Sequence, residues 1–170
     1  MVIELRTCTV RSWKAIDAKS IVRHANNRKV WINLRDRFPH PYTERDAREF
    51  LDTVYKSRED TFFAIEAQGA AIGGIGFMLQ QDVERVSAEI GYWLGEAYWG
   101  RGIATEALGA VTRHAIKHHQ LTRLFALPFA YNIASCRVLE KCGYVLEGRL
   151  RRSAIKDGII VDQLQYAYNS

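Results

Sequence analysis

The order of apolar and polar residues predicts a strand and then helices in the first part of the chain. Val2 to Val10 alternates the two kinds of residue, which is typical of a half-buried strand. From Ile16 to about Leu34 the apolar residues instead recur at helical spacing. The Asn26-Asn27 pair interrupts that stretch, which therefore predicts either one bent helix or two helices.

The middle of the chain predicts a capped helix followed by three strands. Pro39 and Pro41 force a loop, and Thr43 is placed to cap a helix that runs to about Lys56. The strands are expected at Thr61–Ala67, Ala71–Leu79 and Val83–Leu94. Glycines at positions 73, 74 and 76 interrupt the second strand, and such glycines often mark a bulge or the close approach of another backbone.

The remainder of the chain predicts two more helices and three more strands. The helices are expected at Ile103–His118 and Asn132–Cys142, and the strands at Thr122–Phe129, Tyr144–Leu150 and Ile159–Tyr168. Gly143 is a natural left-handed end for the second helix, and Asp157-Gly158 is a hairpin turn. The whole order predicts one α/β domain over residues 1–170, with a mixed, largely antiparallel central sheet of about seven strands flanked by about four helices.

Composition narrows the class of protein. The chain of 170 residues has a net charge of +5 and no apolar run long enough to cross a membrane. Without a signal-peptide pattern or a long Lys/Arg run, it is expected to be cytoplasmic and to bind neither membranes nor nucleic acid directly. Cys8, Cys136 and Cys142 include no CxxC pair, and the last two are interpreted as packing residues rather than nucleophiles. His114 and His118 lack a third ligand, so no metal is expected.

The stretch Tyr98–Leu108 carries the clearest chemical signal. Gly100 and Gly102 flank Arg101 in a short turn between a strand and a helix. A helix N-terminus offers N–H groups and a partial positive charge, and glycines let an anion reach them. The turn therefore predicts a phosphate or pyrophosphate site, although a helix start without a ligand has the same pattern.

Four ordered blocks of residues resemble the RimJ/RimL type of GNAT N-acetyltransferases. They are Phe38–Thr43 with Asp46-Ala47, Glu89–Leu94, Tyr98–Ala107, and Asn132–Ser135 with Glu140–Tyr144 and Glu147-Gly148. The resemblance spans nearly the whole chain and implies the GNAT fold and direct transfer of an acetyl group from acetyl-CoA to an amine. Trp99 stands where the broad family has glutamine or arginine, and Arg101 is the residue that could substitute for the missing contact.

The resemblance also implies which residues contact acetyl-CoA. They are Ile90, Tyr92, Trp93 and Leu94 on the strand, Trp99, Gly100, Arg101, Gly102, Ile103, Ala104 and Thr105 around the turn, and Asn132, Ser135 and Lys141 on the next helix. The strand is expected to pair its backbone with the amides of the pantetheine arm, so the identity of its side chains says little. Backbone N–H groups of residues 100–105 are expected to hold the pyrophosphate.

Two residues are candidates for proton transfer. Glu89 is the candidate base, directly or through a water, because it lies on the strand that leads to the cofactor; it could equally be a polar residue on an open strand face. Ser135 is the candidate acid for the leaving thiolate, or else a first-turn residue of a helix capped by Asn132. Tyr131 and Tyr144 are alternative acids.

The acceptor is the least determined part of the reaction. The resemblance places Trp31, Phe38, His40 and Tyr42 in the acceptor pocket, although core packing explains Trp31 equally well. Arg149, Arg151 and Arg152 attract an acidic acceptor, or they are the solvated end of a strand. The resemblance favours the N-terminal α-amine of a protein, such as a ribosomal protein. A small amine (an amino acid, a polyamine or an antibiotic) and a CoA-binding module without catalysis are the alternatives, and the family often forms homodimers.

Overall fold

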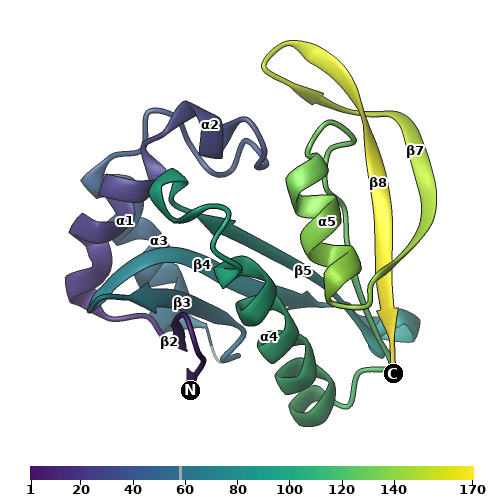
Figure 1. The fold of residues 1–170 in the computed structure, drawn as a ribbon, viewed down its shortest axis with the longest axis horizontal. Coiled ribbons are helices and arrows are strands. Elements are labelled where there is room, and N and C mark those ends of the chain that lie inside the picture. Colours follow the sequence, from purple (N-terminus) through teal and green to yellow (C-terminus); the bar gives the residue numbers. More distant parts are fainter. Residues whose placement is uncertain (58) are drawn as a thin grey trace. The chain divides into compact units, whose positions relative to one another are not determined.

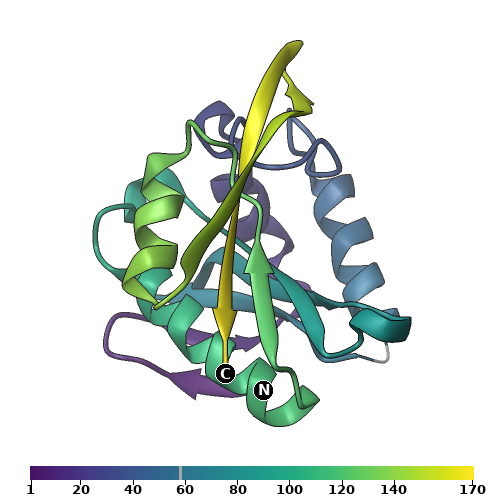
Figure 2. The same cartoon turned by 90° about the vertical axis from the view of Figure 1, so that its right-hand side faces the viewer.

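The computed structural model, drawn as a ribbon in Figures 1 and 2, describes residues 1–57 and 59–170. These residues divide into two compact units. The first unit comprises residues 1–76 and 92–107, and the second comprises residues 77–91 and 108–170. The described residues form eight strands and five α-helices, which confirms the mixed α/β class with a mostly antiparallel sheet. None of the described helices combines the length and the apolar character needed to span a membrane.

The strand beyond the expected number arises at the N-terminus. The stretch predicted as one strand forms two, β1 (Val2–Glu4) and β2 (Thr9–Ser12), which pair antiparallel. The Leu5 N–H closes the turn between them by donating to the Cys8 carbonyl oxygen at 2.9 Å. The Thr7 N–H of the same turn donates to the Glu106 carboxylate at 3.0 Å. The alternation is interrupted at the consecutive polar residues Arg6 and Thr7, which lie in this turn, and the prediction of one strand overlooked that interruption.

Strands β3 (Phe62–Ala67) and β4 (Ala70–Leu79) continue the sheet of the first unit, each antiparallel to the strand before it. Glycines of β4 mark a close approach, as predicted. A Cβ on Gly73 would clash with the carbonyl oxygen of Trp93, which lies on β5 (Ser87–Leu94). A Cβ on Gly74 would lie 2.8 Å from Trp93 Nε1. Residues with a side chain therefore cannot replace these glycines without displacing Trp93.

Among the helices of the first unit, α3 (Glu44–Lys56) begins at the cap residue that the sequence predicts. After the 3-10 turn η1 (Ala15–Asp17), α1 (Ala18–Ala25) ends at the Asn26-Asn27 pair and α2 (Arg28–Trp31) follows it. The Asn27 side chain accepts the Lys29 N–H at 2.8 Å and caps α2, so of the two predicted alternatives, one bent helix or two helices, the structure has two helices. α3 is capped by Thr43, which forms a reciprocal capping box with Asp46.

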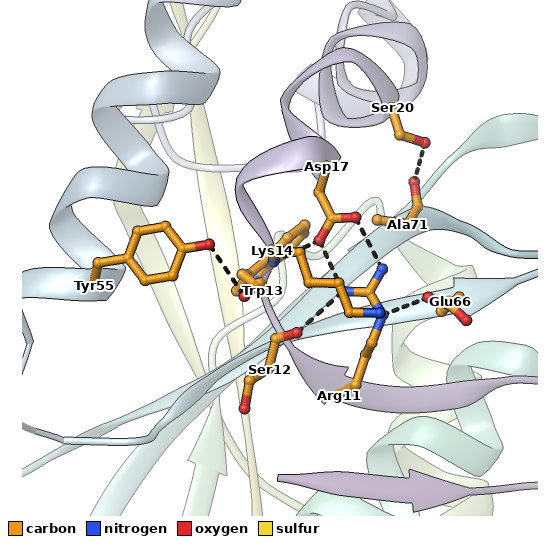
Figure 3. Close-up of polar contacts among 9 residues, drawn as sticks. All are labelled: Arg11, Ser12, Trp13, Lys14, Asp17, Ser20, Tyr55, Glu66 and Ala71. Atoms are coloured by element: carbon orange, nitrogen blue, oxygen red, sulfur yellow. Dashed lines mark hydrogen bonds and ion pairs between the residues drawn. The ribbon is translucent and has the colours of Figure 1, made fainter.

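A buried ion cluster ties η1 to the sheet of the first unit (Figure 3). Arg11 on β2 donates from its two Nη atoms to Asp17 at 2.8 and 2.9 Å, and from Nε to Glu66 on β3. The side chains of Arg11 and Asp17 are only 6% and 4% exposed. Asp17 also accepts the Lys14 N–H at 2.8 Å, which fixes the start of the helical segment.

The second unit holds the other strands of the sheet and helix α5 (Ile133–Lys141). The part of β5 in this unit pairs parallel with β6 (Arg123–Ala126), which pairs antiparallel with β8 (Ile159–Asn169). β8 and β7 (Val145–Lys156) form a long antiparallel ribbon with α5 beside it (Figures 1 and 2). The predicted turn residues are confirmed: Gly143 follows α5 with a φ of 84°, and Asp157 and Gly158 join the two ribbon strands with φ values of 52° and 76°.

Helix α4 (Ile103–His119) begins in the first unit and continues in the second. Two 3-10 turns complete the described elements: η2 (Asp82–Glu84) precedes β5 and η3 (Glu96–Tyr98) follows it. The segment between β5 and α4 is the one in which the sequence predicts an anion site.

Candidate functional site

Residues 95–102, between β5 and α4, form what we call the glycine turn. Gly100 and Gly102 have φ values of 73° and 78°, in the left-handed region that favours glycine. A Cβ on either residue would meet no atom within 4 Å, so the backbone here lies next to open space. The first turn of α4 follows directly, and the first N–H groups of a helix have no partner within the helix. This geometry suits an anion such as a phosphate.

Two side chains support the glycine turn. Trp99 is 43% exposed, yet its Nε1–H donates to the Leu94 carbonyl oxygen at 2.7 Å and so ties the turn to the end of β5. The guanidinium carbon of Arg101 lies 5.4 Å from the centre of the Tyr98 ring, within the range of a cation–π contact. Trp99 therefore braces the turn, and Arg101 contributes its positive charge.

Glu89 lies where β5 and β6 stop pairing. The parallel register ends at the pair of Glu89 with Phe125, and β5 continues to Leu94. The Glu89 side chain is half-buried. Ile90 and Leu94, further along the strand, are 2% and 7% exposed. Their side chains belong to the core, so backbone groups are what these two residues can offer a ligand.

The start of α5 presents Asn132 and Ser135 in the second unit. Asn132 caps the helix, as the alternative interpretation of these two residues expects, because its side-chain oxygen accepts the Ser135 N–H at 3.2 Å. Ser135 is half-buried in the first turn. Lys141 is exposed at the far end of the helix, six residues and about 9 Å further along its axis. The structure therefore brings Asn132 and Ser135 together and separates Lys141 from them.

The two alternative acids differ sharply in their surroundings. Tyr144 is 2% exposed, and its hydroxyl lies 2.7 Å from the Thr112 hydroxyl inside the second unit. Burial raises the pKa of Tyr144. Tyr131 is 44% exposed and its ring stacks on Phe129 with the centroids 5.5 Å apart. Tyr144 thus has a packing role, and Tyr131 is the accessible tyrosine of the pair.

The cysteines next to these residues are poor nucleophiles. Cys136 is 5% exposed, and burial raises the pKa of its thiol. Burial likewise raises the pKa of Cys142. A raised pKa disfavours the reactive thiolate, which agrees with their interpretation as packing residues.

The four aromatic residues predicted for the acceptor pocket form two groups in the first unit. Trp31 stacks on His40, with ring centroids 5.5 Å apart and planes at 30°. Phe38 lies 4.8 Å from the Tyr42 ring and 5.4 Å from the Trp93 ring. Tyr42 is 5% exposed, and burial raises its pKa to about 12. Tyr42 is therefore a packing residue of this unit, whereas His40 is exposed.

Three residues outside the glycine turn contact it, although nothing in the sequence predicted those contacts: Asn27, Lys29 and His24. Glu96, in the turn, accepts a hydrogen bond from the Asn27 side chain at 2.8 Å and forms an ion pair with Lys29. His24 packs against Gly95, where a Cβ would lie 2.8 Å from the His24 Nδ1 atom. These partners are dozens of residues apart, so no local pattern could have joined them.

Comparison with known proteins points to one family. Residues 8–145 match the model of the acetyltransferase (GNAT) domain. A ribosomal-protein-serine acetyltransferase of Escherichia coli is 28% identical over 143 residues, which cover 82% of this chain and 79% of that protein.

Solved structures give the same picture. RimJ of Mycobacterium smegmatis, in complex with a CoA-disulfide, is 25% identical with a TM-score of 0.84 and matches 99% of this chain and 87% of its own. RimL in complex with coenzyme A is 21% identical with a TM-score of 0.87, and the match covers 99% of this chain and 98% of that one. The fold predicted from the RimJ/RimL resemblance is confirmed.

Proposed function

The chain belongs to the GNAT family of acetyltransferases, and on that basis we propose that residues 1–170 act as one domain that acetylates the N-terminal α-amine of a protein. The class of reaction, acetyl-CoA-dependent N-acetyl transfer, is that of the family. A ribosomal protein is the proposed acceptor, supported chiefly by the 28% identity to a ribosomal-protein-serine acetyltransferase. Such an acceptor agrees with the cytoplasmic location expected from the sequence.

The proposed donor site uses the residues around the glycine turn. Backbone N–H groups of residues 100–105 hold the pyrophosphate, supported by the positive φ of Gly100 and Gly102 and by the open space beside them. Arg101 adds a positive charge. Backbone groups of residues 90–94 pair with the pantetheine arm. Asn132 and Ser135 contribute from the start of α5.

The proposed reaction is a direct transfer. Glu89 takes a proton from the acceptor ammonium, directly or through a water. The neutral nitrogen then attacks the thioester carbonyl carbon, so that a C–N bond forms and the C–S bond breaks. Ser135 relays the second proton of the nitrogen to the leaving thiolate, which departs as the thiol of CoA. The aromatic residues Trp31, Phe38, His40 and Tyr42 shape the space for the acceptor.

Trp99→Phe is expected to raise KM for acetyl-CoA about two- to tenfold with little change in kcat, the effect of one lost hydrogen bond. Phenylalanine keeps an aromatic ring but cannot donate to the Leu94 carbonyl, so the glycine turn is held less firmly. Steady-state kinetics at saturating acceptor measures the change. Tyr55→Phe is the matched control, because it also removes one bond to a carbonyl oxygen, that of Trp13, outside the site. An unchanged KM in Trp99→Phe would contradict the bracing role.

The acceptor is tested with a panel of amines, read by thiol release from acetyl-CoA. Peptides with the N-termini of ribosomal proteins are expected to be acetylated with a higher kcat/KM than amino acids, polyamines or aminoglycosides. The same peptides with a blocked N-terminus and an internal lysine are the control for α-amine selectivity. Turnover confined to small amines would favour the small-molecule alternative. Acetyl-CoA binding without turnover of any amine would favour a non-catalytic module.

A further inference from the structure

The glycine turn is attached to β4 and to α1 by contacts that the proposed roles do not explain. The Gly95 N–H donates to the Ile72 carbonyl oxygen at 2.8 Å. A Cβ on Gly95 would lie 2.8 Å from Nδ1 and 3.0 Å from Cβ of His24, so the His24 side chain packs directly on this backbone. The same imidazole meets Tyr98, with ring centroids 5.5 Å apart and planes at 76°. His24 therefore touches the turn on both sides of Glu96.

Glu96, in the middle of these contacts, is bound by two residues at the start of α2. It accepts a hydrogen bond from Asn27 Nδ2 at 2.8 Å and forms an ion pair with Lys29. The Asn27 amide makes two bonds at once, because its Oδ1 accepts the Lys29 N–H at 2.8 Å and caps α2. The hydrogen bonds from Lys29 and Asn27 lower the pKa of Glu96, so the carboxylate stays charged at neutral pH.

Asn26, the neighbouring asparagine, binds the end of the segment that contains the residues predicted for the acceptor pocket. We call residues 28–42 the aromatic segment; it contains Trp31 stacked on His40. At its far end, the Tyr42 N–H donates to Asn26 Oδ1 at 3.1 Å. The Asn26-Asn27 pair therefore binds the last residue of the aromatic segment with one side chain and the glycine turn with the other.

We propose that the Asn26-Asn27 pair and Glu96 couple the donor site to the acceptor site. Binding of the donor at the glycine turn then sets the position of the aromatic segment. The identity of the two ligands rests on the proposed function. Glu96 stands four residues before Gly100, on the same short turn, so a ligand that draws in the glycine turn also moves the point to which Asn27 is attached. By linkage, donor and acceptor change each other's affinity by the same factor, and we expect about five- to tenfold, at the low end of measured couplings.

Variants of the described contacts separate this coupling from simple structural support. Asn27→Asp keeps an oxygen to cap α2 but places a second carboxylate against Glu96, which breaks the link. Adding Glu96→Gln to Asn27→Asp restores a hydrogen bond with donor and acceptor exchanged. Glu49→Gln is the matched control for loss of an exposed carboxylate, because it breaks the ion pair of Arg45 and Glu49 on α3.

Amide hydrogen exchange over residues 26–42 measures the coupling without any acceptor. Saturating CoA is expected to slow this exchange about five- to tenfold in the wild type and in Glu49→Gln, because it shifts a local opening equilibrium. Asn27→Asp should lose the effect and the double variant should regain it. The acceptor KM, measured over a range of acetyl-CoA concentrations, should show the same pattern.

Three outcomes distinguish a failed coupling from a failed function. If calorimetry shows that CoA binds the wild type but exchange over residues 26–42 is unchanged, the coupling is overturned and the proposed function stands. Persistence of the full CoA effect in a folded Asn27→Asp variant also overturns it. If CoA does not bind the wild type at all, the donor site and the coupling are both refuted.

Discussion

Glu89→Gln is expected to lower kcat about 100- to 10,000-fold, the range that a general base contributes, with little change in KM for acetyl-CoA. Glutamine keeps the size of the side chain at the last pair of β5 with β6 but cannot take a proton. The loss should shrink at high pH, because a free α-amine with a pKa near 8 then deprotonates in solution. Rates measured from about pH 6 to about pH 9 with saturating acetyl-CoA test both expectations.

The control for this variant is Glu84→Gln. Glu84 is an exposed glutamate on η2, in the same unit and shortly before β5. It should leave kcat and its pH profile unchanged. Wild-type turnover by Glu89→Gln over the whole pH range would show that Glu89 is only a polar residue on the strand and that another group accepts the proton.

Arg11→Met is expected to destabilise the protein by about 3–5 kcal/mol, because it leaves the buried carboxylate of Asp17 without its cation. Methionine fills similar space but offers no donors to Asp17 or Glu66. For a chain of this length the melting temperature should fall by about 10 °C. Urea unfolding followed by circular dichroism gives the free energy directly.

The cause of that loss can be separated from the loss of packing. Adding Asp17→Asn to Arg11→Met removes the stranded charge, so the double variant should recover part of the stability. Arg45→Met is the control, because Arg45 pairs with Glu49 at an exposed site where the side chains are 86% and 61% accessible. It should leave the urea unfolding transition almost unchanged, because exposed ion pairs contribute little to stability. Equal effects of Arg11→Met and Arg45→Met would contradict a special role for the buried cluster.

Local patterns are sufficient for the parts of the fold that depend on neighbouring residues. Thr43 caps α3, Gly143 follows α5 in a left-handed conformation, and Asp157-Gly158 turns the ribbon, each as predicted. The break at Asn26-Asn27 is also confirmed. Caps and tight turns are decided by backbone conformation and by partners within about four residues, so a single sequence contains the information.

The prediction was incomplete where local patterns permit two structures. The alternation from Val2 to Val10 fits one long strand as well as the hairpin of β1 and β2. The alternation shifts by one position at Arg6-Thr7, a short irregularity, and the turn there is held by Glu106, about a hundred residues away. The strand count therefore differs by one although the class of fold is right.

The sequence by itself determined the periodic elements, the caps and the glycine turn, and its ordered motifs were enough to indicate the family. Only the tertiary structure decided that Trp99 donates to Leu94 and that Tyr144 is buried against Thr112. It alone joined Asn27 to Glu96, 69 residues apart. The reason is physical: a side chain's partner and its burial depend on how the whole core packs, and no spacing along the chain encodes contacts between residues so far apart.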